Sequence, residues 1–365
     1  MSRERWEILR LEERYYERIW GGRKLKTMYG KPIPENVLIG EAWLVSDHPG
    51  DESVIAEGPL KGRTLQELIA ADPAALLGAK ARPTPGGRFP LLLKILDSAE
   101  HLSVQVHPDD ACAERLGEPD VGKTEMWHVL HAEPGSELIC GLDPNVARDT
   151  FARAIPDGSV ETFMNRFNVR PGTTAFVAAG TVHAIGGGIV LAEIQQNSDL
   201  TYRIYDWGRV DSDGKPRELH IEKALEAIHL GSPHGGEANP LACRAEDGAE
   251  RTVLAACRHF AADHIACRGC CKRDTRGDSF HILLAKSGPL AVDVGQKTHT
   301  IDVAQAVLIP GQHEHYRVEG LGEFLDYYVP DLELDIIKPL LAAGHSRDAI
   351  TLLGGDTQHS DLRDG

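Results

Sequence analysis

The sequence predicts a mainly β protein, built as a sandwich or barrel from two successive blocks of strands. Three observations lead to this prediction. Many short apolar or alternating segments are separated by turns that contain Gly and Pro, and segments with helical spacing are few. Similar turns also end in a histidine in both halves, Val-Ala-Ala-Gly-Thr-Val-His183 and Leu-Ile-Pro-Gly-Gln-His313. We therefore expect two related β blocks.

The first block, with its helices, extends to about residue 230. Leucines and an isoleucine spaced along residues 64–80 predict a pair of short amphipathic helices. The apolar run 91–96 reads as a buried strand, and the alternating run 102–107 places Ser103, Gln105 and His107 on one face of the next. Further strands are expected at 127–131, 137–141, 174–178, 189–195 and 201–205, and helices at 146–155, 159–166 and 220–229.

The remainder divides into a linker, a second β block and a tail. Residues 231–250 are rich in Gly, Pro, Asn and Asp, which is typical of a linker. The second block, at 251–330, is expected to be structural and non-catalytic, with a partly helical tail at 331–365. Its strands are predicted at 280–285, 290–294, 304–309 and 323–329.

Composition excludes several classes of function. The 365 residues carry a formal charge of −16, which disfavours a nucleic-acid-binding role. No segment approaches the roughly 20 apolar residues that span a bilayer, and the charged start differs from a signal peptide, so we expect a cytoplasmic protein. The seven cysteines, among them Cys267, Cys270 and Cys271, are expected to be ordinary reduced thiols. Binding of a phosphate would require an acidic protein to gather its cations in one pocket.

Four residues of the first block are candidate metal ligands: Gln105, His107, Glu125 and His183. Neutral imidazoles and a carboxylate are the ligand types of catalytic zinc sites, which keep one position open. Each residue alone could have an ordinary structural role, and spacing leaves both interpretations open.

The stretch 193–209 supplies a second group of polar residues. Asp199 and Arg203 would share one face of an alternating strand, either as a salt bridge or as an acid/base or substrate-orienting pair. Lys94, Lys123, Arg203 and Arg209 are the cations that a phosphorylated substrate would need. The run 186–188, three glycines, is expected to form a tight turn after a strand.

These residues lie in stretches that closely resemble the type I mannose-6-phosphate isomerase family in its shorter bacterial form. The matching stretches are 20–22, 40–43, 89–97, 102–110, 122–127, 179–185 and 193–209. The resemblance implies two cupin-type β-barrel (jelly-roll) domains with a small helical insertion, and one zinc ion held by Gln105, His107, Glu125 and His183. It implies that Arg203 is catalytic, that Lys94, Lys123, Glu193 and Asp199 line the site, and that Arg209 lies near the phosphate of the substrate.

The expected activity is zinc-assisted proton transfer between C1 and C2, which interconverts mannose 6-phosphate and fructose 6-phosphate. Glu193, Asp199 and Lys123 are the candidates for the base. Two alternatives stay open, a catalytically inactive cupin that binds a sugar phosphate and another metal-dependent cupin enzyme. The chain departs from the family pattern at Ala178, where proline is common. His313 and His315 resemble ligands but lack an upstream partner motif in their block, so a second metal is not expected.

Overall fold

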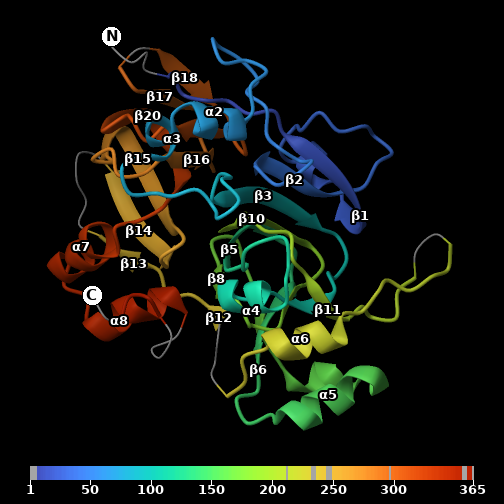
Figure 1. Cartoon of the computed structure of the whole chain (residues 1–365). Helices are drawn as coiled ribbons and strands as arrows, with labels where there is room; N and C mark the ends of the chain where they lie inside the picture. The colour runs from blue at the N-terminus through green and yellow to red at the C-terminus, as the bar shows by residue number, and fades with distance from the viewer. Residues whose placement is uncertain are drawn as a thin grey trace. The chain divides into compact units, whose positions relative to one another are not determined.

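A computed structural model describes residues 6–210, 213–231, 236–243, 249–295, 297–355 and 360–363 (Figure 1). The chain folds into two compact units that interleave in sequence. Unit 1 comprises Met1–Arg14, Trp43–Leu92 and Asn239–Gly365, and unit 2 comprises Tyr15–Ala42 and Leu93–Ala238. The expected mainly β architecture is confirmed in both units.

Unit 2 contains two sheets whose assigned strand pairs are antiparallel. The larger sheet, which belongs mainly to this unit, has the order β1 (Arg14–Gly22), β2 (Ile39–Val45), β3 (Leu91–Ser98), β10 (Ile189–Gln196), β5 (Glu125–Ala132), β8 (Thr174–Val177) and β12 (Gly236–Glu237). The smaller sheet has the order β11 (Tyr202–Tyr205), β4 (Val104–Val106), β9 (His183–Ile185), β6 (Glu137–Leu142) and β7 (Met164–Asn168).

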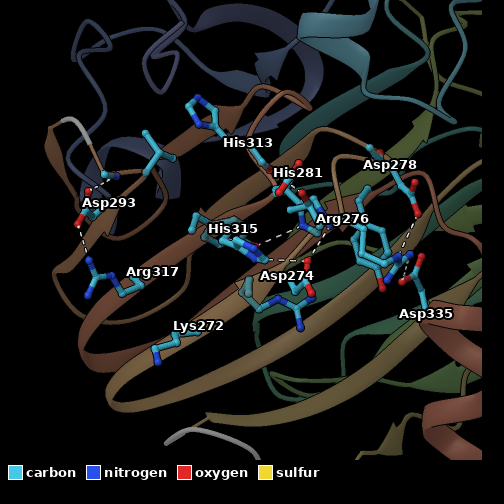
Figure 2. A pocket seen from close by; sticks show the side chains of 18 of the residues that line it. Lys272, Asp274, Arg276, Asp278, His281, Asp293, His313, His315, Arg317 and Asp335 are labelled. Carbon is cyan, nitrogen blue, oxygen red and sulfur yellow. Dashed lines mark hydrogen bonds and ion pairs between the residues drawn. The ribbon is translucent and has the colours of Figure 1, made fainter. Parts of the chain in front are cut away.

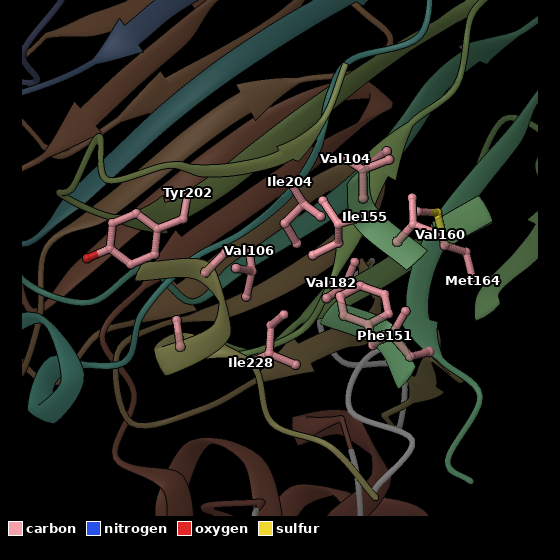
Figure 3. Packing of buried hydrophobic residues seen from close by; sticks show 14 of the residues in the cluster. Val104, Val106, Phe151, Ile155, Val160, Met164, Val182, Tyr202, Ile204 and Ile228 are labelled. Atoms are coloured by element: carbon pink, nitrogen blue, oxygen red, sulfur yellow. The ribbon is translucent and has the colours of Figure 1, made fainter. Parts of the chain in front are cut away.

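Period-two alternation gives the smaller sheet two different faces. Its inner residues, such as Leu138 and Ile185, join Trp127 and Leu191 of the larger sheet in one apolar core. Its outer residues pack under helices α5 (Arg148–Asp157) and α6 (Ile221–Ala227) and the 3₁₀ turn η1 (Ser159–Phe163), with Phe151 fully buried among them (Figure 3). Because Val104 and Val106 face the helices, Gln105 points to the core side.

Unit 1 is built on one eight-stranded sheet. Its strands are β13 (Leu241–Ala242), β14 (Ala249–Ala256), β15 (Ala261–Asp274), β20 (His315–Tyr328), β16 (His281–Ala285), β19 (Ala306–Ile309), β17 (Leu290–Asp293) and β18 (Thr298–Ile301). The long strands β15 and β20 pair along 14 residues each. The C-terminal turns and helices cover part of the sheet through Ile336, Leu340 and Leu353. They are η2 (Leu332–Ile337), α7 (Lys338–Ala342), α8 (Arg347–Thr351) and η3 (Leu352–Gly354).

The short helices predicted at 64–80 are present as α2 (Leu65–Ala71) and α3 (Pro73–Leu77). Thr64 and Glu67 form a capping box at the start of α2, and Asp72 caps α3 with proline at its first position. These helices belong to unit 1, not to the first β block. The reason is a long-range backbone pairing, in which the Phe280 amide donates to the Leu77 carbonyl.

Other differences from the predictions have local causes. The predicted helix 159–166 is a 3₁₀ turn that passes into strand β7, and the helix α1 (Lys24–Thr27) was not predicted. Across the described residues the strands form open sheets with distinct edges and no closed barrel, as a jelly-roll fold allows. Parts of the predicted linker (232–235 and 244–248) and of the tail (356–359, 364–365) lie outside the described residues. No helix of the described chain has the length and apolar character needed to cross a bilayer.

Candidate metal site

Three strands of unit 2 bring the candidate ligands to one point. His107 follows β4 directly, Glu125 begins β5, and His183 begins β9. β4 and β9 are neighbours, with Gln105 opposite His183. One ligand atom each from His107, Glu125 and His183 lies within 4.8 Å of the others, and all three residues are buried. Three ligating atoms from distant parts of the sequence therefore converge inside the sandwich.

Backbone carbonyls orient both imidazole rings. His107 Nδ1 bonds to the Leu200 carbonyl at 2.7 Å, and His183 Nδ1 bonds to the Thr181 carbonyl at 2.8 Å. Because a carbonyl only accepts, Nδ1 carries the proton in each ring and Nε2 keeps its lone pair. Both Nε2 atoms lie 3.5 Å from a Glu125 oxygen.

The centre of this group is electrically and sterically suited to a cation. His107 Nε2 and both carboxylate oxygens of Glu125 are buried and have no hydrogen-bond partner in the described part of the chain. Unpaired buried polar atoms are costly, and an ion bound between them would satisfy all three. Burial, with nearby Lys123, lowers the pKa of His107 well below its usual value and that of His183 to about 4. Both rings are therefore neutral, as metal ligation requires. The residues support a metal.

Gln105 lies beside these three residues. Its Nε2 is 3.3 Å from His183 Nε2, and a half-turn of the amide would exchange this nitrogen for the carbonyl oxygen. The side chain is half-buried and lines an adjacent cavity of about 300 Å³. Gln105 therefore links the metal-ligating group to the cavity, and its oxygen is available as a fourth ligand.

The cavity next to the metal-ligating group is rich in cations. Five basic side chains and three acidic ones line it: Arg18, Lys94, Lys123, Arg203, Arg217, Glu41, Glu193 and Asp199. In a chain of net charge −16, this excess of basic residues is the local concentration of cations that an anionic ligand needs.

Two buried lysines lie close to carboxylate groups. Lys123 Nζ is 3.3 Å from Glu125, and Lys94 Nζ is 3.6 Å from Glu193 and 3.7 Å from Glu41. Burial alone would lower the pKa of Lys123, but Glu125, Glu193 and Asp199 outweigh it and raise the pKa above its usual value. Lys123 therefore stays protonated.

Glu193, in contrast to Lys123, is shifted toward its uncharged form. Burial, followed by the charge of Glu125, raises the pKa of its carboxyl, while Lys94 and Lys123 oppose the shift. Trp127 Nε1 donates to Glu193 Oε1 at 2.9 Å, which fixes the carboxylate in place. A positioned carboxylate with a raised pKa is a typical proton acceptor in an active site.

Asp199 and Arg203 both line the cavity, although Asp199 lies ahead of β11 and not within it. Arg203 is held by Ser103 Oγ at 3.2 Å and by the Glu218 carbonyl at 2.9 Å. Burial lowers the pKa of its guanidinium, and Arg217 contributes to the shift. The two side chains share the cavity, but no ion pair between them is present among the described residues.

Among the predicted catalytic and substrate-binding residues, Arg209 lies outside the cavity lining. It bonds to Asp206 at 2.5 Å and to the His101 carbonyl. Arg217 bonds to the same carboxylate at 2.5 Å and lines the cavity. Arg18, Glu41 and Arg217 were missed as site residues. Glu41 lies in a stretch that resembles the family, whereas no sequence pattern singled out Arg217.

Among its described residues, the second β block has no comparable group of ligands. His313 Nε2 bonds to the Trp6 carbonyl at 2.7 Å, and His315 Nδ1 lies 3.4 Å from Asp274. In the described part of the chain, His107, Glu125 and His183 form the one cluster of three His, Cys, Asp or Glu ligands. The expectation that the second block binds no metal stays a prediction. The cysteines of the block are free thiols.

The glycines 186–188 form the expected turn between β9 and β10, where a Cβ on Gly186 would meet the Glu137 carbonyl oxygen at 2.2 Å.

Comparisons with known proteins identify the family of the chain. The phosphomannose isomerase type I catalytic-domain profile matches residues 8–137. A mannose-6-phosphate isomerase of Streptococcus mutans is 34% identical over 315 residues, which are 86% of this chain and 96% of that protein. The crystal structure of the Bacillus subtilis enzyme superposes with a TM-score of 0.80 at 32% identity, covering 88% of this chain and 99% of that one. A mannose 6-phosphate isomerase structure with bound zinc and yttrium shares the fold, with a TM-score of 0.66 at 17% identity. The chain therefore belongs to the type I mannose-6-phosphate isomerase family.

Proposed function

We propose that this enzyme interconverts mannose 6-phosphate and fructose 6-phosphate with one zinc ion per chain. The observation that carries the proposal is the convergence of His107, Glu125 and His183 beside a cation-rich cavity. Lys123 connects the two, since it lines the cavity and lies 3.3 Å from Glu125. A group that favours a metal thus adjoins a space that favours an anionic, phosphorylated sugar.

Zinc bound by His107, Glu125, His183 and Gln105 would supply a Lewis acid that polarises the carbonyl of the substrate. The choice of zinc rests on the donor set of two imidazoles, a carboxylate and an amide, and on the zinc held by a relative of the same fold. The remaining chemistry belongs to side chains of the cavity.

Of the three candidate bases, Glu193 fits best. Lys123 is protonated, so it can stabilise negative charge but cannot accept a proton. Asp199 is exposed, whereas Glu193 is 4% exposed and has a raised pKa. We assign to Glu193 the removal of the proton from C2 of the aldose and its return to C1; passage of the C2 hydroxyl proton to the C1 oxygen completes the conversion to the ketose.

The cations divide between the reacting end and the phosphate. Lys123 and Arg203 would stabilise the negative charge that develops on the sugar oxygens when C2 loses its proton. Arg217, another guanidinium of the cavity, would hold the phosphate and fix the position of C1 and C2 against Glu193. The cytoplasmic location expected from the sequence stays a prediction.

A coupled isomerase assay with metal analysis on the same sample tests the proposal. Chelation should remove about one equivalent of zinc and abolish conversion of mannose 6-phosphate, and added zinc should restore both. Full turnover by metal-free protein would refute the role of the metal. Stoichiometric zinc without turnover would instead favour the inactive sugar-phosphate-binding alternative.

A further inference from the structure

Unit 1 contains a cavity of about 720 Å³ to which the proposed isomerase chemistry assigns no role (Figure 2). It lies among the ends of β15, β16 and β20 and the turn η2, and every lining residue belongs to unit 1. Its size is within the range of small-molecule sites, and its lining is predominantly polar.

Two fully buried carboxylates, Asp263 and Asp326, underlie this cavity. Arg273 donates to Asp326 at 3.0 Å and to Asp263 at 2.9 Å, and Arg251 donates to Asp263 at 2.7 Å. Two guanidinium groups therefore neutralise two carboxylates, and this network has no net charge.

His281 is the best-defined group of the cavity. Its ring is 5% exposed and stacks on Tyr328, with centroids 4.6 Å apart and planes 7° apart. His281 Nδ1 bonds to Asp326 at 2.8 Å, and Tyr316 donates to the same carboxylate at 2.8 Å. Although burial opposes it, the neighbouring His281 and Arg273 lower the pKa of Asp326, so its carboxylate stays ionised and accepts a hydrogen bond from His281 Nδ1.

Three nitrogens of this network have no partner within the part of the chain that the structure describes. They are His281 Nε2, Arg251 Nη1 and Arg273 Nη1, and all three residues line the cavity. The guanidinium nitrogens can only donate, whereas Nε2 of an imidazole accepts a hydrogen bond when the ring is neutral and donates one when the ring is protonated. A ligand group that can both donate and accept satisfies all three nitrogens in either state of the ring.

A hydroxyl group has this property and a phosphate dianion does not. The charge around the cavity agrees, since its five Arg and Lys residues (251, 272, 273, 276 and 317) face five Asp and Glu residues of the lining (274, 278, 293, 314 and 335) and the two buried carboxylates beneath it, which leaves no excess of positive charge for an anion. At the rim, Arg276 is already paired with Asp278 at 3.0 Å and with Asp335 at 2.8 Å. The cavity of unit 2, by contrast, has an excess of basic residues.

We infer that the cavity of unit 1 binds a neutral polyhydroxylated small molecule, such as a hexose, through His281, Arg251 and Arg273. The site is separate from the metal-ligating group, because its residues belong to another unit. It needs neither a metal nor the isomerase reaction, and its ligand would stabilise unit 1.

Calorimetric titration of the zinc-loaded chain with mannose, fructose, mannitol and inorganic phosphate tests the inference. The variant His281→Asn keeps a nitrogen near the Nδ1 position for Asp326 but removes Nε2, so the Kd for the sugar should rise about tenfold. Leu334→Trp is a second variant, since Leu334 lines the cavity, is 41% exposed and lies outside the buried network. The larger side chain should abolish binding. His128→Asn, a buried histidine of unit 2, is the matched control.

Binding of a neutral sugar or polyol that both cavity variants weaken, with isomerase turnover and thermal stability retained, would support the inference. No binding of any neutral probe at millimolar concentration would overturn it. Equal affinity in the wild type and both variants would also overturn it, because the ligand would then lie elsewhere. Binding of phosphate alone would replace it with an anion site.

Discussion

The substitution Glu125→Gln provides the sharpest test of the metal site. Glu125 is fully buried, lies 3.5 Å from the ligating nitrogen of each histidine and is the only carboxylate of the group. The amide keeps the shape of the side chain but removes its charge. Substitution of residues that only support a metal ligand weakens metal binding about 10- to 100-fold. Loss of a charged ligand should therefore weaken zinc binding by about 100-fold or more.

The expected size follows from mass action. Zinc at about 1,000 times its Kd should stabilise the wild type by roughly 4 kcal/mol, and after a 100-fold loss of affinity the same zinc should give roughly 1.4 kcal/mol. For a domain of 150–250 residues, these values correspond to increases in Tm of about 8–16 °C and about 3–6 °C.

Thermal unfolding with chelator and with zinc measures this difference directly. His128→Asn is the control, since His128 is also buried on β5 but bonds to Thr174 Oγ1 and lies outside the ligating group. It should retain the full response to zinc. An equal zinc response in Glu125→Gln and the wild type would refute the assignment of Glu125 as a ligand.

Three further predictions concern charged side chains. Arg203→Ala should lower kcat by about 10²-fold or more without changing the zinc content, as expected for loss of a charge-stabilising group. Arg166→Ala, a change outside the cavity, should leave kcat unaltered. Arg217→Gln should raise KM for mannose 6-phosphate about tenfold, and Arg209→Gln should raise it much less, because Arg217 lines the cavity and Arg209 does not. An equal rise in KM for both variants would contradict the assignment of Arg217 to the phosphate. Burial, with a smaller contribution from the charge of Glu52, raises the pKa of Asp47 from 3.8 to about 6. Protonated Asp47 therefore stabilises the folded state fully below pH 3.8, and this stabilisation is lost as the pH rises through 6. Asp47→Asn should therefore gain stability relative to the wild type, by at most about 3 kcal/mol between pH 4 and pH 8, and parallel unfolding curves would refute the shift.

Local patterns predicted the ligand-bearing strands because a strand fixes the direction of its side chains. Val104 and Val106 alternate with Gln105, and this alternation is enough to place Gln105 toward the core. The turn before β10 was predictable from its three successive glycines, and the structure adds why Gly186 is needed, since a Cβ there would meet the Glu137 carbonyl.

Features that depend on distant contacts could not be predicted in this way. Arg217 reaches the cavity from an irregular segment, where no periodicity fixes the direction of a side chain, and its partner Asp206 is 11 residues away. The strand β15 contains Gly269 and the polar residues Arg268 and Lys272, which weaken a strand signal, and its stability comes from the long pairing with β20.

The interleaving of the two units in sequence determines the order in which they can be completed during synthesis. Unit 1 begins with residues 1–14 and 43–92, but most of its sheet lies beyond residue 239. Leu9 hydrogen-bonds to Leu308, so at translation rates of about 5–20 residues per second the early segment waits on the order of 15–60 seconds for its partner. Unit 2 is wholly synthesised before that partner emerges. A nascent chain stopped near residue 238 would therefore expose Ile8 and Leu9, which are buried in the finished protein, and would be a substrate for chaperones, not an independent catalytic fragment.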